Sequence, residues 1–209
     1  MAKIEWLGHA SFRIGNGVTI YIDPWKLAET DPPKADLILV SHSHFDHLSA
    51  EDIARISTPE TVIIGSADCE GKVEGNFRPA WPGQNHPYGD VVVRTTRAYN
   101  KDKEFHPNDS QWLGFLVTVG GETIYYAGDT DVIDEMSQLG EVDVALLPVG
   151  GTYTMTAEEA AQAVNEKIRP KRAIPYHFGD IVGARGDAEK FQGLCQCPVE
   201  IQEGGKTKT

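Results

Sequence analysis

Residues 37–48 read LILVSHSHFDHL, an apolar run followed at once by three histidines and one aspartate. The stretch 36–40 shows no polar alternation, which is typical of a strand buried on both faces. A single histidine after such a strand would favour a structural role. Three imidazoles and a carboxylate at one strand exit are costly unless a cation uses them, and they are preferred ligands of zinc and its neighbours. HxHxDH therefore predicts a metal-binding loop that can serve two adjacent ions.

More candidates lie further along the chain. Asp129 in YAGDT and His177 in PYHFG each directly follow a short apolar run, and His106 in EFHP lies seven residues before another. Five of the seven histidines then belong to one pattern, and His9 and His86 lie outside it. This concentration predicts one shared site.

The rest of the chain alternates short strands with a few helices. We expect strands at 3–7, 11–14, 18–23, 36–40, 61–64, 91–98, 113–119, 122–127, 142–147, 173–176 and 199–201. Helices are expected at 49–57, at 132–139 and from the capping box at Thr156 to about residue 168, with a weak one after 176. Residues 65–90 show no clear periodicity. This order predicts two similar halves of one domain (1–209), each a sheet covered by helices on one side.

Composition limits the function. The net charge of −12 argues against nucleic acid as a partner, because phosphate backbones select basic faces. No segment approaches the roughly 20 apolar residues of a membrane span, and the start lacks a secretory signal. Three cysteines (Cys69, Cys195 and Cys197) form no disulfide framework, which favours the cytoplasm.

The motifs SHSHFDHLS, YAGDTD and PYHFGD, in this order, resemble the metallo-β-lactamase superfamily. WLGHASFRI, IDPW and LLPVGGTYTMTAEEA resemble more narrowly its metal-dependent hydrolases related to ascorbate-6-phosphate lactonase. The resemblance covers almost the whole chain. It implies an α/β fold, a four-layer αβ/βα sandwich with two mixed sheets face to face and helices outside.

The resemblance also implies two divalent metal ions, most simply Zn²⁺, with Mn²⁺ or Fe²⁺ as alternatives. The implied ligands are His42, His44 and a third histidine for the first ion, Asp46, His47 and His177 for the second, and Asp129 as the bridge. We assign the third histidine to His106, because imidazole is a better ligand than a carboxamide. Asn100, at a strand end where relatives often carry histidine, is the alternative.

These parts predict a hydrolase. A metal lowers the pKa of bound water to about 7, so hydroxide becomes available, and Asp46 can orient it and pass a proton to the leaving group. Two dications against two aspartates and one hydroxide leave about one positive charge, which favours a small anionic ester, lactone or phosphodiester. The alternative is a non-catalytic metal-binding or regulatory protein on the same fold.

Five further residues each allow a functional and a structural interpretation. His9 is equally suited to the site mouth and to a structural role, whereas Asp23 and Trp25 favour a turn over support of the metal loop. Tyr153 and Thr154 could line the pocket or merely connect a strand to a helix. The remaining histidine, in a Pro- and Gly-rich loop, is expected at the surface.

Overall fold

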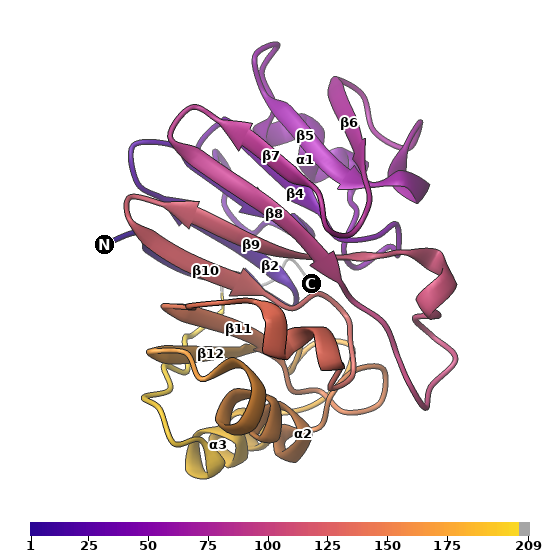
Figure 1. The fold of residues 1–209 in the computed structure, drawn as a ribbon. Helices are drawn as coiled ribbons and strands as arrows, with labels where there is room; N and C mark the ends of the chain where they lie inside the picture. Colours follow the sequence, from indigo (N-terminus) through magenta and orange to yellow (C-terminus); the bar gives the residue numbers. More distant parts are fainter. Residues whose placement is uncertain (205–209) are drawn as a thin grey trace.

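Two mixed sheets of six strands each form the centre of the computed structural model, which describes residues 1–204 (Figure 1). The first sheet contains, in spatial order, β1 (Lys3–Gly8), β2 (Ser11–Gly15), β3 (Thr19–Ile22), β4 (Leu37–Val40), β5 (Val62–Ser66) and β6 (Asn76–Ala80). The second contains β12 (Arg172–Tyr176), β11 (Val144–Pro148), β10 (Glu122–Tyr126), β9 (Leu113–Val119), β8 (Val91–Arg97) and β7 (Asn85–Tyr88).

Each sheet has an antiparallel part and a parallel part. Strands β1 to β3 and β7 to β10 are antiparallel meanders, whereas β3 to β6 and β10 to β12 are parallel. Parallel neighbours need a crossover, which usually contains a helix. The crossovers hold α1 (Ala50–Ile56), the 3₁₀-helix η3 (Asp134–Gln138) and α2 (Ala157–Gln162), which continues as the π-helix η4 (Ala163–Ile168). Helix α3 (Arg185–Leu194) follows β12.

The largest apolar core includes side chains of both sheets. Phe12 of β2 meets Tyr126 of β10 at 6.1 Å and Tyr176 of β12 at 5.5 Å between ring centroids, and all three are fully buried. Helix α1 places Ile53 and Ile56 in a second, smaller cluster with residues of β3 to β5, while α2 and α3 lie beside β11 and β12 (Figure 1). The predicted fold class, two mixed sheets with helices outside, is confirmed.

The predicted helix starts carry the expected hydrogen bonds. The Ser49 hydroxyl accepts from the Asp52 amide at the start of α1, at 3.1 Å. Thr156 and Glu159 form the reciprocal capping box of α2, at 3.2 and 2.8 Å. Throughout residues 1–204 the helices are too short or too polar to pass through a bilayer.

Three expectations differ from the structure. Residues 65–90 contain β6 and β7, which are edge strands with Pro79 and Pro87 inside them; proline breaks strand patterns and is tolerated only at edges. The helix expected at 132–139 is the short η3. The strand expected at 199–201 is reduced to one bridge between Ala173 and Val199.

Candidate metal centre

The predicted site residues follow the ends of four strands. The loop after β4 turns at once, because the amides of His47 and Leu48 both donate to the His44 carbonyl, at 3.0 and 2.9 Å. The long loop from β8 to β9 extends beyond the sheets and carries His106 (Figure 1). Asp129 follows β10 and His177 follows β12 directly. Since β10 and β12 run in the same direction within one sheet, their ends lie at one edge.

Three histidines form a first group. The ligand nitrogens of His42, His44 and His106 lie within 4.8 Å of one another. His42 Nε2 is 3.0 Å from His44 Nδ1, a spacing that suits two ligands of one ion. The indole of Trp112 packs against this group, with its centroid 4.6 Å from that of His42 and 4.7 Å from that of His44.

A second group contains Asp46, His47, His177 and His9, again with ligand atoms within 4.8 Å. The Oδ2 atom of Asp46 is 3.0 Å from His9 Nε2, 3.8 Å from His47 Nε2 and 4.0 Å from His177 Nε2. His9 therefore lies inside the cluster, in contact with the carboxylate for which we predict a catalytic role.

Asp129 lies between the two groups. Its Oδ2 atom is 3.3 Å from His47 Nε2 and 3.2 Å from the Nε2 atoms of both His106 and His177. Two ligands about 2.0–2.1 Å from one tetrahedral ion are about 3.4 Å apart. The spacing around Asp129 is therefore compatible with metal ligation, and it makes Asp129 a candidate link between the two groups.

A buried carboxylate supports His47 from behind. Asp23 Oδ2 accepts from His47 Nδ1 at 2.7 Å, from the Ser41 hydroxyl at 2.5 Å and from the Tyr126 hydroxyl at 2.6 Å. Its Oδ1 atom accepts from the Ser41 amide at 2.7 Å. The contact with Nδ1 fixes the ring orientation and leaves the Nε2 lone pair for a cation.

Asn100 supports His106 in the same way. Its Oδ1 atom accepts from both Nδ1 and the backbone amide of His106, at 2.9 and 3.0 Å. Its amide group donates to Asp131 Oδ1 at 3.1 Å and to the carbonyl oxygen of Tyr153 at 3.0 Å. Asn100 thus lies behind the imidazole, and His106 is the residue whose ring faces the cluster.

The histidines have unequal proton affinities. Burial, and after it the charge of neighbouring histidines, lowers the pKa of His42 and His44, so both rings are neutral near pH 7, the form that binds metal. Burial opposes the charge on His47 too, yet the carboxylates of Asp129 and Asp23 raise its pKa well above the usual value. The two carboxylates thus create a strongly negative potential at the buried His47 ring.

The aspartates are ionised. Burial opposes their charge, but the hydrogen bond from His9 lowers the pKa of Asp46 to about 2. Contacts with His177 and His47 hold the pKa of Asp129 well below its usual range. Both carboxylates are therefore anionic across the physiological pH range.

Several buried polar atoms have no hydrogen-bond partner. Within residues 1–204 these include His47 Nε2, His177 Nε2 and Asp129 Oδ1, all of which belong to predicted ligands. An unpaired buried polar atom costs about 1–3 kcal/mol. Divalent cations would satisfy all three, so the donor set fits a metal centre.

The structure brings all seven predicted ligands into these overlapping groups, although they come from separate parts of the chain: His42, His44, Asp46, His47, His106, Asp129 and His177. Sequence reasoning undervalued Asp23, for which a turn role was favoured, because the contact with His47 depends on β3 and β4 being parallel neighbours. Ser41, hydrogen-bonded to His42 Nδ1 at 2.9 Å, was missed altogether.

The remaining candidates are more distant. Trp25 packs on His9, with 5.2 Å between ring centroids. Tyr153 contributes a carbonyl oxygen to Asn100, and Thr154 is fully buried. His86 lies half-buried in the edge strand β7, where a loop was expected.

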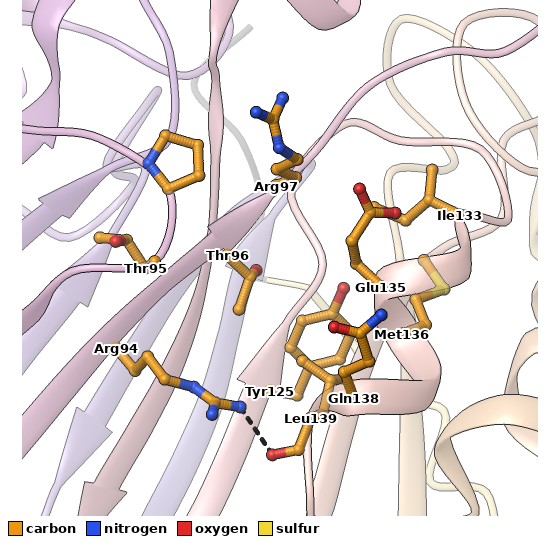
Figure 2. A pocket seen from close by; sticks show the side chains of 12 residues that line it. Arg94, Thr95, Thr96, Arg97, Tyr125, Ile133, Glu135, Met136, Gln138 and Leu139 are labelled. Carbon is orange, nitrogen blue, oxygen red and sulfur yellow. Dashed lines mark hydrogen bonds between the residues drawn. The ribbon is translucent and has the colours of Figure 1, made fainter.

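A cavity of about 320 Å³ lies apart from the cluster, between η3 and β8 to β10 (Figure 2). Arg94, Tyr125 and Glu135 are among its lining residues, and none of the predicted ligands is. Arg94 is occupied, because its Nη2 atom donates to the Leu139 carbonyl at 2.6 Å (Figure 2). The cavity offers no group of catalytic type comparable to the His/Asp cluster.

Comparisons with known proteins identify the family of this chain. Residues 3–177 match the model of the "Beta-lactamase superfamily domain". A UPF0173 metal-dependent hydrolase of Staphylothermus marinus is 36% identical, over 100% of this chain and 99% of the relative. One from Pyrococcus abyssi is 35% identical, over 93% and 92%.

Solved structures show the same fold. A protein from Parabacteroides distasonis superimposes with a TM-score of 0.88 at 30% identity, over 97% of this chain and 93% of that one. A metallo hydrolase from the archaeon Ignicoccus hospitalis does so with a TM-score of 0.76 at 26% identity, over 99% and 97%. The chain therefore belongs to the beta-lactamase superfamily and, within it, to the UPF0173 metal-dependent hydrolases.

Proposed function

We propose that this metal-dependent hydrolase uses a dinuclear centre to cleave a small anionic ester, lactone or phosphodiester. His42, His44 and His106 would hold the first ion, and Asp46, His47 and His177 the second, with Asp129 shared between them. Imidazole with carboxylate suits Zn²⁺ best, and Mn²⁺ or Fe²⁺ accept similar ligands.

The position of Asp129 is the observation that carries the proposal. Its Oδ2 atom lies 3.2–3.3 Å from three imidazole nitrogens that belong to both groups. A carboxylate that bound a single ion would not need imidazole nitrogens of both groups around one of its oxygen atoms. The unpaired Oδ1 atom of the same side chain adds a second acceptor in the cluster.

Bound divalent ions would supply hydroxide at neutral pH and stabilise negative charge on the substrate oxygen. The chain's own contribution falls to Asp46, whose carboxylate is partly accessible, with 13% of its side chain exposed. Asp46 would orient the attacking oxygen and then carry its proton to the leaving group. His9, 3.0 Å from Asp46 Oδ2, would hold that carboxylate in place.

The substrate and location follow from charge and composition. Two dications against two aspartates leave positive charge in the centre, which favours a small anion despite the net charge of −12. That net charge disfavours nucleic acid. Three free cysteines support a cytoplasmic location. A lactone substrate, and one domain over residues 1–209, remain predictions of the sequence.

The test combines elemental analysis with a panel of acyl esters, lactones and phosphodiesters. Two equivalents of metal per chain and turnover of one substrate class are expected. His44→Ala should lose metal and activity together. Two bound metals without turnover of any panel member would favour the non-catalytic alternative, and a single equivalent would contradict the dinuclear assignment.

A further inference from the structure

Three exposed apolar side chains belong to the segments that carry the predicted ligands. Among residues 1–204, seven large apolar side chains are exposed, and three of them are Phe45, Phe105 and Ile181, at 70%, 48% and 39%. Phe45 lies between two predicted ligands, Phe105 directly precedes another, and Ile181 follows a fourth by four residues. We call these three residues the apolar rim. Exposed apolar groups that cluster at one place often mark a binding surface.

Packing behind Phe45 connects it to the second ligand group. Its ring forms a T-shaped pair with Trp25, at 6.0 Å between centroids and 74° between planes. Trp25 in turn packs on His9, which contacts Asp46. Phe45 is thus connected to Asp46 through Trp25 and His9, while most of its surface faces solvent.

Lys26 connects Ile181 to the same region. The Lys26 ammonium lies 4.3 Å from the centroid of Trp25 and 3.4 Å from the carboxylate of Asp180, the neighbour of Ile181. Cation–π contacts of this kind are worth about 0.5–1 kcal/mol at exposed sites. The loop after β12 is thereby tied to the segment beneath Phe45.

Phe105 directly precedes His106 of the first ligand group. Its ring meets Tyr153 edge-to-face, at 4.7 Å and 87°. The carbonyl oxygen of Tyr153 accepts from Asn100, which positions His106. Phe105 is therefore fixed relative to the third imidazole of that group, although nearly half of its surface is exposed.

We propose that the apolar rim binds an apolar part of the substrate, which is then an ester or lactone that carries an aliphatic or aromatic group of several carbons. This inference rests on the proposed function, because the scissile group must sit at the cation pair. A polar head at the cations and an apolar body on the rim describe an amphiphilic substrate. Ionic metabolites without an apolar group would leave the rim unused.

The test measures binding separately from turnover. Acetate, butyrate, hexanoate and octanoate, as product-like anions, are titrated into the zinc-loaded protein by calorimetry. Affinity should rise about two- to fourfold per added methylene, the range for partial to full burial of a methylene group. The variants are Phe45→Ala, Phe105→Ala and the double variant. Val92→Ala is the matched control, since Val92 is 42% exposed on β8 and far in sequence from the ligands.

The rim variants should keep their metal and bind acetate normally, yet lose most of the chain-length dependence, which Phe45→Leu should restore. Equal affinity for all four anions, no binding of any of them, or an unchanged slope in the double variant would each overturn the inference. So would dimers of the wild type that the double variant lacks, with the slope unchanged, because the rim would then be a subunit contact. Chain-length-dependent binding without hydrolysis of any ester would leave the rim intact and refute the proposed hydrolysis instead.

Discussion

Replacing Asp23 by asparagine separates support of the metal centre from ligation. Asp23 touches none of the cations in our assignment, but its carboxylate accepts four hydrogen bonds, one of them from His47 Nδ1 at 2.7 Å. Asparagine keeps the shape and tolerates the left-handed backbone at this position (φ 44°). It replaces one acceptor oxygen by a donor and removes the charge that the other bonds share.

The magnitude follows from those bonds. A hydrogen bond to a charged group is worth about 1.5–3 kcal/mol and a neutral one about 0.5–1.5, and a donor left unpaired costs about 1–3 kcal/mol. The neutral amide also avoids the cost of burying a charge, which offsets part of this loss. We therefore expect the free energy of unfolding to fall by about 2–4 kcal/mol. This corresponds to a Tm lower by roughly 5–15 °C for a chain of this size. Metal affinity should fall about 10–100-fold, the usual effect of removing a partner behind a histidine ligand.

The assay titrates zinc into the folded, metal-free variant against a competing chelator, with urea unfolding measured in parallel. Asp36→Asn is the matched control, because the Asp36 carboxylate accepts from the Thr19 amide at 2.7 Å without touching a histidine. The control should lose stability but keep its metal affinity. A folded Asp23→Asn protein that binds zinc within about twofold of the wild type would refute the reasoning.

Further outcomes are expected. Asp46→Asn should lower kcat by at least about a hundredfold in a folded protein; wild-type rates would remove Asp46 from the mechanism. Asn100→Ala should weaken binding of one metal equivalent about 10–100-fold, as seen by zinc titration, and an unchanged titration would contradict its supporting role. Chelation should lower the Tm, by about 5–10 °C if the free metal is near a hundred times its Kd, whereas no shift in calorimetry would exclude a resident ion. In the chelated protein, four histidines have a lowered pKa (His9, His42, His44 and His86) and one, His47, has a raised pKa. The unfolded chain then binds more protons below about pH 6.5, so the urea midpoint should fall between pH 6.5 and 5, and a rise would contradict this sign.

Much of the site could be predicted because its signal is local. The three histidines of residues 42–47 lie within six positions, and Asp129 and His177 stand directly after apolar runs, so strand ends alone bring them together. His106 was preferred to Asn100 on ligand chemistry, and the structure adds a physical role for both, with the amide behind the imidazole. That pairing depends on a loop shape that periodicity does not encode.

Other features depend on long-range contacts and could not be predicted. A turn role was favoured for Asp23 over support of the metal loop, because its contact with His47 requires β3 and β4 to be neighbours. The edge strands β6 and β7 were not predicted, because proline and glycine in this region interrupt the alternation of apolar and polar residues. The exposure of Phe45 could not be predicted either, because an aromatic residue within a motif is compatible with a buried and with an exposed position.

Backbone strain gives an independent reason to assign function to this cluster. Six residues other than glycine adopt positive φ within residues 1–204, and three of them are His9, Asp23 and His177, at 45°, 44° and 61°. Each costs about 1–2 kcal/mol relative to an ordinary conformation. The His177 amide donates to the His9 carbonyl at 3.0 Å, so two strained residues hold each other, and a side chain at Gly150 would come within 2.2 Å of the His177 carbonyl. Glycine at position 177 would relieve the strain without loss of that backbone bond, but it would remove the imidazole. The fold therefore tolerates an unfavourable backbone at the position of a proposed ligand ring, which stability alone does not explain.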